Sequence, residues 1–135
     1  MIAVGRFDGV HLGHRHLLSQ ARAVAQAHGC PLLAYTFPPD PPALLPLSAK
    51  VRLLRELADE VEVAPFAQVR ELRAEEFLRQ EIQERLGGCA LVMGPDHRFG
   101  RAREADPEQA KKLGEKLGLE VWVVEPFQLD GQVVS

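Results

Sequence analysis

The chain has 135 residues, of which 46% are hydrophobic and 26% charged, and its formal net charge is −3. This length suits one domain with its own core, and the composition is that of a globular protein. The slightly acidic balance excludes an overall basic field that would attract nucleic acid, and no apolar run is long enough to span a membrane. No signal-peptide pattern precedes Ile2, so the sequence predicts a cytoplasmic protein.

Short apolar strands alternate with segments of helical periodicity along the chain. This alternation predicts an α/β fold: a Rossmann-like open parallel sheet with helices on both faces, followed by a small C-terminal hairpin. The predicted strands are Ile2–Gly5, Pro31–Phe37, Val61–Ala64, Ala90–Gly94 and Glu120–Val124. The predicted helices are Gly13–His28, Ser48–Leu57, Ala74–Leu86 and Pro107–Leu117.

Helix ends and turns carry specific signals. Ser48 is a candidate N-cap for the second helix, and Asp106 for the fourth, where Pro107 takes the first position and Gly118 ends the helix. Prolines between 38 and 46 exclude a helix or an interior strand there and predict a loop. Near the C-terminus, Asp130-Gly131 predicts a hairpin turn between strands 127–129 and 132–134.

The two cysteines are far apart in the sequence, and each lies next to a predicted strand. Cys30 and Cys89 are therefore expected to be buried, reduced thiols rather than a disulfide or a metal-binding pair.

The most informative stretch is Gly-Arg-Phe-Asp-Gly-Val-His-Leu-Gly-His, residues 5–14. It joins the first strand to an amphipathic helix, and a helix N-terminus attracts phosphate through its unpaired N–H groups and partial positive charge. Glycines at 5, 9 and 13 allow close backbone approach, and His11 and His14 add imidazole donors. The stretch predicts a site that holds phosphate and stabilises charge developing on it.

In open parallel sheets, ligands bind at the carboxyl ends of the strands near the switch in strand order. Three motifs fall at such ends: the turn after the first strand, Thr36-Phe37 with the proline loop, and the segment 93–100. The predicted topology brings these three motifs together.

Phe-Asp-Gly-Val-His-Leu-Gly-His, residues 7–14, resembles the signature of the HxGH nucleotidyltransferases, and within them the FMN adenylyltransferase module of the FAD synthetase family. The resemblance covers nearly the whole chain. Thr36-Phe37, Lys50 and Phe77 match family positions, and residues 94–106 resemble the family's Gly-x-Asp-Phe-Arg-Phe-Gly segment with its following basic residues. The family's module is usually the N-terminal half of a bifunctional enzyme that includes riboflavin kinase.

The chain departs from the family pattern at several positions. Arg6 stands in place of Asn, Pro38 and Asp40 in place of Asp and His, and His97 in place of Phe in the flavin region. Of the family's Ser-Thr-x-Ile-Arg element, the sequence contains only the first residue, Ser135. The expectation is a nucleotidyltransferase domain over residues 1–135, truncated at its C-terminal end and without a riboflavin kinase domain.

The resemblance implies an enzyme that transfers an adenylyl group from ATP to FMN, giving FAD and pyrophosphate. It assigns catalysis to His11 and His14, and assigns Mg²⁺ mainly to the ATP phosphates rather than to protein ligands. The implied nucleotide-binding residues are Gly5, Phe7, Asp8, Gly9, His11, Gly13, His14 and Arg98. The implied flavin-binding residues are Phe37, Asp96, His97 and Phe99.

Several readings stay open. Asp8 could orient its loop or touch a ligand, Arg101 and Arg103 could be solvated surface charges, and Phe37 and Phe99 could be core residues. His16 is interpreted as a surface helix residue, and His28 as a residue at a helix C-terminus, where the dipole favours an imidazolium. The alternative functions are a sister nucleotidyltransferase with another phosphate acceptor, or a non-catalytic nucleotide- or flavin-binding module. The expected partners are small molecules and a riboflavin kinase, fused or separate.

Overall fold

The structure is a computed structural model that describes most of the chain. The described residues are 1–5, 7, 12–37, 47–65, 69–88, 90–94, 97–101, 104–124, 127–129 and 132–134.

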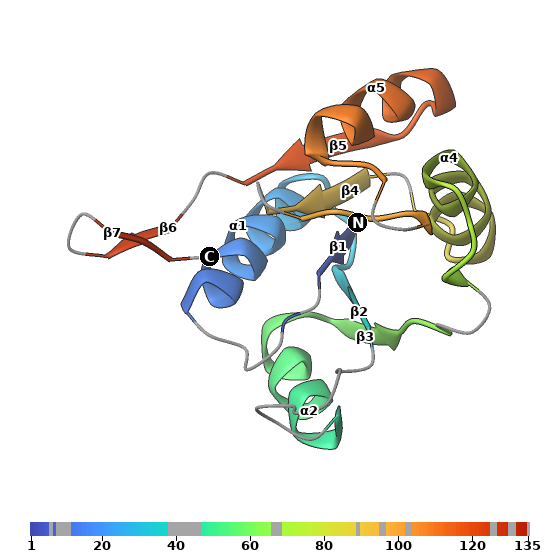
Figure 1. The fold of residues 1–135 in the computed structure, drawn as a ribbon. Helices are drawn as coiled ribbons and strands as arrows, with labels where there is room; N and C mark the ends of the chain where they lie inside the picture. Colours follow the sequence, from blue (N-terminus) through green and yellow to red (C-terminus); the bar gives the residue numbers. More distant parts are fainter. Residues whose placement is uncertain are drawn as a thin grey trace.

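Five parallel strands form the central sheet, in the order β3-β2-β1-β4-β5 (Figure 1). β1 lies at the centre and pairs with two strands distant in sequence, so that Ile2 is in register with Leu33 on one side and Leu91 on the other. The predicted open parallel sheet is confirmed, with strand ends that differ by one or two residues. The strands are β1 (Ile2–Val4), β2 (Leu33–Thr36), β3 (Glu60–Val63), β4 (Ala90–Met93) and β5 (Glu120–Val123).

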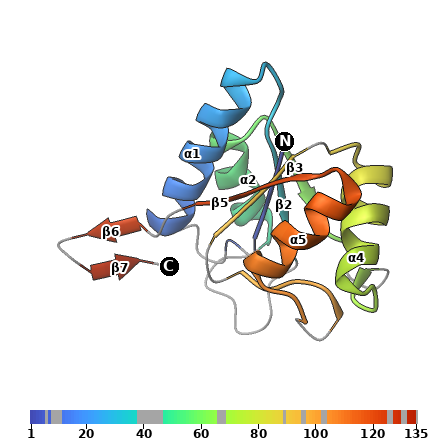
Figure 2. The same cartoon turned by 90° about the horizontal axis from the view of Figure 1, so that it is seen from above.

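Helices cover both faces of the sheet, which Figure 2 shows edge-on. On one face lie α1 (Leu12–Ala27) and α2 (Leu47–Leu57); on the other lie α4 (Ala74–Glu76), its continuation η1 (Phe77–Arg85), and α5 (Pro107–Leu117). Strand residues alternate between two apolar cores: Ala3 packs with α1 and α2, while Ile2 and Val4 pack with η1 and α5. Two-sided burial is the reason that the three inner strands β1, β2 and β4 are almost uniformly apolar, whereas the edge strands β3 and β5 carry glutamates.

The segment predicted as one regular helix over 74–86 is α-helical only in its first turn. From Phe77 to Arg85 it is a π-helix, in which the N–H of Leu86 reaches the carbonyl of Glu81, five residues back, at 3.1 Å. Four residues of η1 are buried: Phe77, Leu78, Glu81 and Ile82. Glu81 thus lies on the buried side of the helix with apolar neighbours.

The cap signals of the sequence have mixed outcomes. Asp106 accepts a hydrogen bond from the Gln109 N–H at 2.9 Å, and Gly118 ends α5 in the left-handed region with φ 74°, so both predictions for this helix are confirmed. Ser48 is wrong as an N-cap, because α2 already begins at Leu47 and Ser48 lies inside its first turn. The apolar pattern of α2 includes Leu47, which extends the helix by one residue.

The C-terminal hairpin is confirmed as two antiparallel strands, β6 (Phe127–Leu129) and β7 (Gln132–Val134). The predicted turn Asp130-Gly131 lies outside the described residues. The hairpin projects beyond the sheet, with β6 beside α1 (Figure 1). Cys30 is a free thiol but only half-buried, contrary to the expected burial, and Cys89 lies outside the described residues. Among the described helices, none has the length and apolarity to cross a bilayer.

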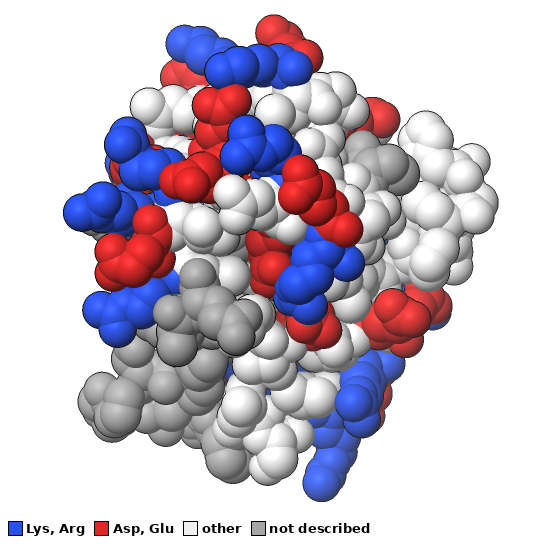
Figure 3. Space-filling model, turned by 90° about the vertical axis from the view of Figure 1, so that its right-hand side faces the viewer, with Lys and Arg blue, Asp and Glu red and all other residues white. Residues whose placement is uncertain are grey.

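Charges of both signs mingle on the face that carries α4 and η1 (Figure 3). Lys116 of α5 pairs with Glu75 of α4 at 2.9 Å, and Arg73 pairs with Glu104 at 2.8 Å. These pairs tie α4 to α5 and to the loop that precedes α5. Exposed pairs of this kind add little stability each, so the packing of the two cores carries the fold.

Candidate functional site

Three chain segments leave the same edge of the sheet. β2, β1 and β4 are neighbours and parallel, so Gly5, Phe37 and Gly94, which follow them, lie along one carboxyl edge. The Gly5 N–H donates to the carbonyl of Tyr35 at 3.0 Å and joins the first segment to the second. Because the connection from β1 runs to β2 on one side while β4 pairs on the other, the switch in strand order falls at this edge.

Phe7 lies two residues beyond Gly5, in the segment that follows β1. Its φ is 51°, a left-handed backbone conformation that is rare for an aromatic residue. The ring is buried and lies directly over Gly5, where an added Cβ would be 2.9 Å from Cζ of Phe7. Gly5 is therefore the residue that lets this ring fold back onto the end of β1.

His14 lies in the first turn of α1 and is half-buried. Its ring meets the Phe7 ring edge-on, with centroids 5.4 Å apart and planes at 88°. Phe7 thus fixes the imidazole at the helix N-terminus, where backbone N–H groups favour an anion. Gly13 belongs to the same first turn; Asp8, Gly9 and His11 lie outside the described residues.

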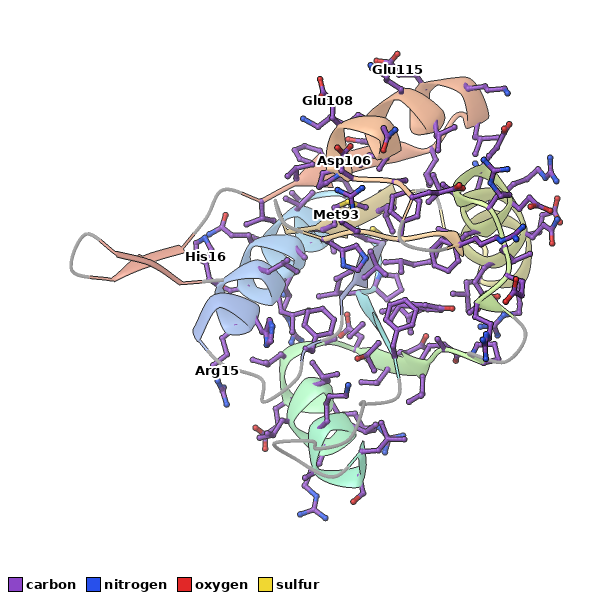
Figure 4. All side chains as sticks on the ribbon, in the orientation of Figure 1. Arg15, His16, Met93, Asp106, Glu108 and Glu115 are labelled. Carbon is purple, nitrogen blue, oxygen red and sulfur yellow. The ribbon has the colours of Figure 1, made fainter. Side chains whose placement is uncertain are left out.

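The residue after His14 points the other way: Arg15 of α1 projects into solvent (Figure 4). Met93, at the end of β4, is by contrast fully buried near the centre of the molecule. His16 is half-buried, on a groove that α1 shares with Trp122 of β5, rather than on the fully exposed surface.

At the end of β2, a buried cation holds the backbone of a predicted flavin residue. Lys50 of α2 is only 1% exposed, and its Nζ donates to the carbonyl of Phe37 at 2.8 Å. Phe37 itself is half-buried and adjoins the proline loop, which lies outside the described residues. The sequence analysis matched Lys50 to the family without predicting its burial; the available signal was its position four residues before Leu54, on the buried side of α2.

The loop after β4 brings two predicted flavin residues together. His97 is half-buried and its ring stacks parallel to that of Phe99, with centroids 6.5 Å apart and planes at 4°. Phe99 is 4% exposed and belongs to the core on the η1 side, so His97 is the more accessible ring of the two. Arg98 is exposed, and Asp96 lies outside the described residues.

The same loop is anchored to the start of α4. Phe99 and Ala105 form a pair of backbone hydrogen bonds of 3.0 and 3.1 Å, and the Arg101 N–H reaches the carbonyl of Leu72. The Glu104 carboxylate binds Arg73 and accepts the N–H of Ala74 at 2.7 Å. The hydrogen bond from Arg73, and then that from Ala74, hold the pKa of Glu104 below its usual value. The side chain of Arg101 faces Glu71 at 3.7 Å, an exposed pair that fits the surface reading; Arg103 lies outside the described residues.

The arrangement defines a doubly wound α/β protein, with a glycine–aromatic–histidine turn, an aromatic strand end and an anchored aromatic loop along the carboxyl edge of its sheet. The chain belongs to the FAD synthetase family, because the model of that family matches residues 1–135.

The chain is similar to the bifunctional riboflavin kinase/FMN adenylyltransferase of Pseudomonas fluorescens, with 33% identity over 98% of this chain and 46% of the relative. It is also 31% identical to the protein of the same name from Escherichia coli K12, over all of this chain and 47% of the relative. FAD synthetase 1, chloroplastic, of Arabidopsis thaliana is 26% identical over 98% of this chain and 40% of that protein. The chain thus spans about half the length of the curated relatives that it matches.

A solved structure has the same fold over 99% of this chain and 47% of its own, with a TM-score of 0.79 and 27% identity. That structure is described as a macrolide-efflux protein from Streptococcus pneumoniae.

Proposed function

We propose that this chain transfers the adenylyl group of ATP to FMN, giving FAD and pyrophosphate. The observation that carries the proposal is the placement of His14 against Phe7 at the N-terminus of α1, in a chain that matches the FAD synthetase family over all its residues. The names of the relatives, which include FMN adenylyltransferase, support the same reaction.

In the proposed reaction, a phosphate oxygen of FMN attacks the α-phosphorus of ATP in line. A new P–O bond forms, the bond to the bridging oxygen of the β-phosphate breaks, and pyrophosphate leaves with that bond's electron pair. The protein contributes position and fixed positive charge: the α1 N-terminus, His14 and, by resemblance, His11 donate to the phosphate oxygens.

The nucleotide phosphates are proposed to lie over residues 5–14, with Arg98 as an added cation. The flavin ring is proposed to lie between the end of β2 and the loop after β4, near Phe37, Asp96, His97 and Phe99. Because Phe99 is buried beneath His97, Phe37 and His97 are the better candidates for direct ring contact, and Phe99 supports His97 from below.

Mg²⁺ is proposed to arrive with the ATP phosphates, whose charge it would neutralise. Within the described parts of the chain, no group of three or more His, Cys, Asp or Glu side chains could hold a metal ion. No described set of residues therefore fits a protein-built magnesium cage, and no step of the reaction is assigned to protein-bound metal.

The module is proposed to work in the cytoplasm as one nucleotidyltransferase domain. FMN arises by phosphorylation of riboflavin, so a riboflavin kinase, fused or separate, is the proposed partner activity; the names of the bacterial relatives combine both activities.

Incubation of the chain with ATP, Mg²⁺ and FMN, followed by chromatography for FAD, tests the proposal. His14→Ala should lower the rate about 10²–10³-fold, the cost of losing one preorganised donor. His16→Ala, two residues further along α1, is the matched control and should keep the parent rate. Adenylylation of a different phosphate acceptor but not of FMN would favour a sister transferase, and nucleotide or flavin binding without any transfer would favour a non-catalytic module.

A further inference from the structure

A polar cluster that is buried at Tyr35 and Glu81 and reaches solvent at Arg85 joins β2, η1 and β3. Tyr35 of β2 is fully buried, and its hydroxyl donates to Oε2 of Glu81 on η1 at 2.5 Å. Arg85, one turn further along η1, binds both oxygens of Glu81, with Nη2 2.7 Å from Oε2. The same Nη2 donates to Oε1 of Glu62 on β3 at 2.9 Å.

Tyr35 and Glu81 keep opposite protonation states in this cluster. Burial, and then the hydrogen bond and charge of Glu81, raise the pKa of Tyr35 far above its ordinary value. Burial alone would raise the pKa of Glu81, but hydrogen bonds from Arg85 and Tyr35 outweigh it and keep the pKa low. Tyr35 is thus a permanent donor and Glu81 a permanent carboxylate at neutral pH. A buried charge held this completely gives its partners a fixed geometry.

The Tyr35 ring contacts aromatic residues on two sides. It meets Phe37 edge-on at 5.6 Å and Phe77 at 5.8 Å, with interplanar angles of 81° and 72°. The Phe77 ring packs in turn against the Phe99 ring, with centroids 6.0 Å apart, and Phe99 stacks on His97. An unbroken row of rings therefore leads from the end of β2 to the loop after β4, the two segments proposed to contain the flavin.

We propose that Glu81 and Arg85 position Tyr35, and that Tyr35 in turn sets the Phe37 and His97 ends of this aromatic row for a flat heteroaromatic acceptor such as the flavin ring. The inference rests on the proposed function and assigns positioning residues for acceptor selection. A phenol tied at its hydroxyl cannot slide or tilt without breaking a buried, charge-assisted hydrogen bond. Rings that pack edge-on against it are held in the same way.

A cluster that only stabilises the fold would behave differently. Its loss would lower the melting temperature and affect all ligands together, whereas a positioning cluster would weaken FMN binding and leave ATP binding alone. Leu113→Ala provides the matched control, because Leu113 of α5 packs against the same core without belonging to the aromatic row.

The experiment compares Tyr35→Phe, Glu81→Gln, Leu113→Ala and the parent. FMN binding is measured by calorimetry and by the change in FMN fluorescence, ATP binding by calorimetry, and KM for each substrate by FAD formation. We expect Tyr35→Phe to weaken FMN binding and raise the KM for FMN about tenfold, equal to roughly 1.4 kcal/mol. Its ATP affinity and the KM for ATP should stay within about twofold of the parent values.

Glu81→Gln keeps an oxygen that can accept from Tyr35 and loses the charge, so its FMN affinity should fall between those of the parent and Tyr35→Phe. This variant carries the test if Tyr35→Phe does not fold. Leu113→Ala should lower the melting temperature while FMN affinity stays at the parent value.

Unchanged FMN affinity in both cluster variants, or equal losses for FMN and ATP, would overturn the positioning role while leaving the proposed function in place. A parent protein that binds ATP but neither binds FMN nor forms FAD would overturn both.

Discussion

The Phe7 ring packs closely over Gly5 at the candidate site. A Cβ at residue 5 would lie 2.9 Å from the Phe7 ring, which is buried and in turn faces His14. Gly5→Ala should therefore displace the ring and destabilise the protein by about 1–3 kcal/mol, the usual cost of overpacking. ATP binding should weaken with it, because His14 loses its support.

Thermal unfolding and ATP calorimetry measure the two effects of Gly5→Ala. Gly94→Ala is a suitable control at the end of β4, since its added Cβ meets only the side chain of Leu17, at 3.4 Å. A Gly5→Ala protein with the stability and ATP affinity of the parent would show that the ring can move at no cost.

Tyr35 is the only tyrosine of the chain, so its ionisation can be followed by absorbance without interference from another tyrosine. Its pKa is raised in the folded protein, whereas in the unfolded chain it is about 10. Below pH 10 both states keep the proton and this group does not change stability. As the pH rises above about 10, only the unfolded chain releases the proton, so the free energy of unfolding falls by up to about 1.4 kcal/mol per pH unit.

We therefore expect tyrosinate absorbance to rise together with the loss of circular dichroism at high pH, not before it. In Tyr35→Phe, this contribution to the fall of the unfolding free energy with rising pH should vanish. A tyrosinate signal that appears near pH 10 in a still-folded protein would contradict the buried hydrogen bond to Glu81.

At the scale of elements, α5 is the helix whose ends are best defined. The Asp106 carboxylate accepts a hydrogen bond from the Gln109 N–H, and the Gln109 side-chain oxygen accepts one from the Asp106 N–H at 3.0 Å. Asp106→Ala should lower the free energy of unfolding by about 1 kcal/mol, as for other lost caps. Asp106→Asn keeps an acceptor and should retain most of the stability in urea unfolding; equal losses in the two variants would mean that the cap bond contributes nothing.

The strands of this fold and both ends of α5 could be predicted because their signals are local, whereas the N-cap predicted for α2 at Ser48 was wrong. Asp106, Pro107 and Gly118 mark α5 within a dozen residues, and apolar runs mark the strands. The π-helical turn of η1 could not be predicted in this way. Glu81 within this turn binds Tyr35, which lies on another element far away in sequence, so the surroundings of the turn are not visible in the local pattern.

The same reason explains what was missed at the site. A lysine or glutamate in a helix is normally interpreted as solvent-exposed, because burial of its charge is costly without a partner. Lys50 has the carbonyl of Phe37 and Glu81 has the hydroxyl of Tyr35, and tertiary structure supplies both of these partners, whereas Arg85 is a local partner of Glu81 on the same helix. The convergence of three motifs at one edge was predictable, because it follows from the topology of a parallel sheet.

At the scale of the whole molecule, the proposed nucleotide site is an anion site on a protein with net charge −3. Its attraction for phosphate must therefore be local, from the α1 N-terminus and nearby side chains. ATP at a hundred times its Kd should raise the free energy of unfolding by about 2.7 kcal/mol, and adenosine at the same concentration by clearly less. Thermal shifts at two salt concentrations measure this. Equal shifts for ATP and adenosine would place the phosphates away from the helix end.

The central position of β1 also has a consequence for how the protein folds during synthesis. Among the five strands of this sheet, β1 comes first in the sequence and has neighbours on both sides, so the pairing of Ile2 with Leu91 cannot form until β4 has left the ribosome. Until then the emerging chain can pair β2 with β1 and β3, but the other apolar edge of β1 stays without its neighbour β4. Late, non-local closure of this kind slows folding and leaves the nascent chain exposed to aggregation. A chaperone that shields apolar strand edges would thus be needed most in the interval between synthesis of β2 and synthesis of β4.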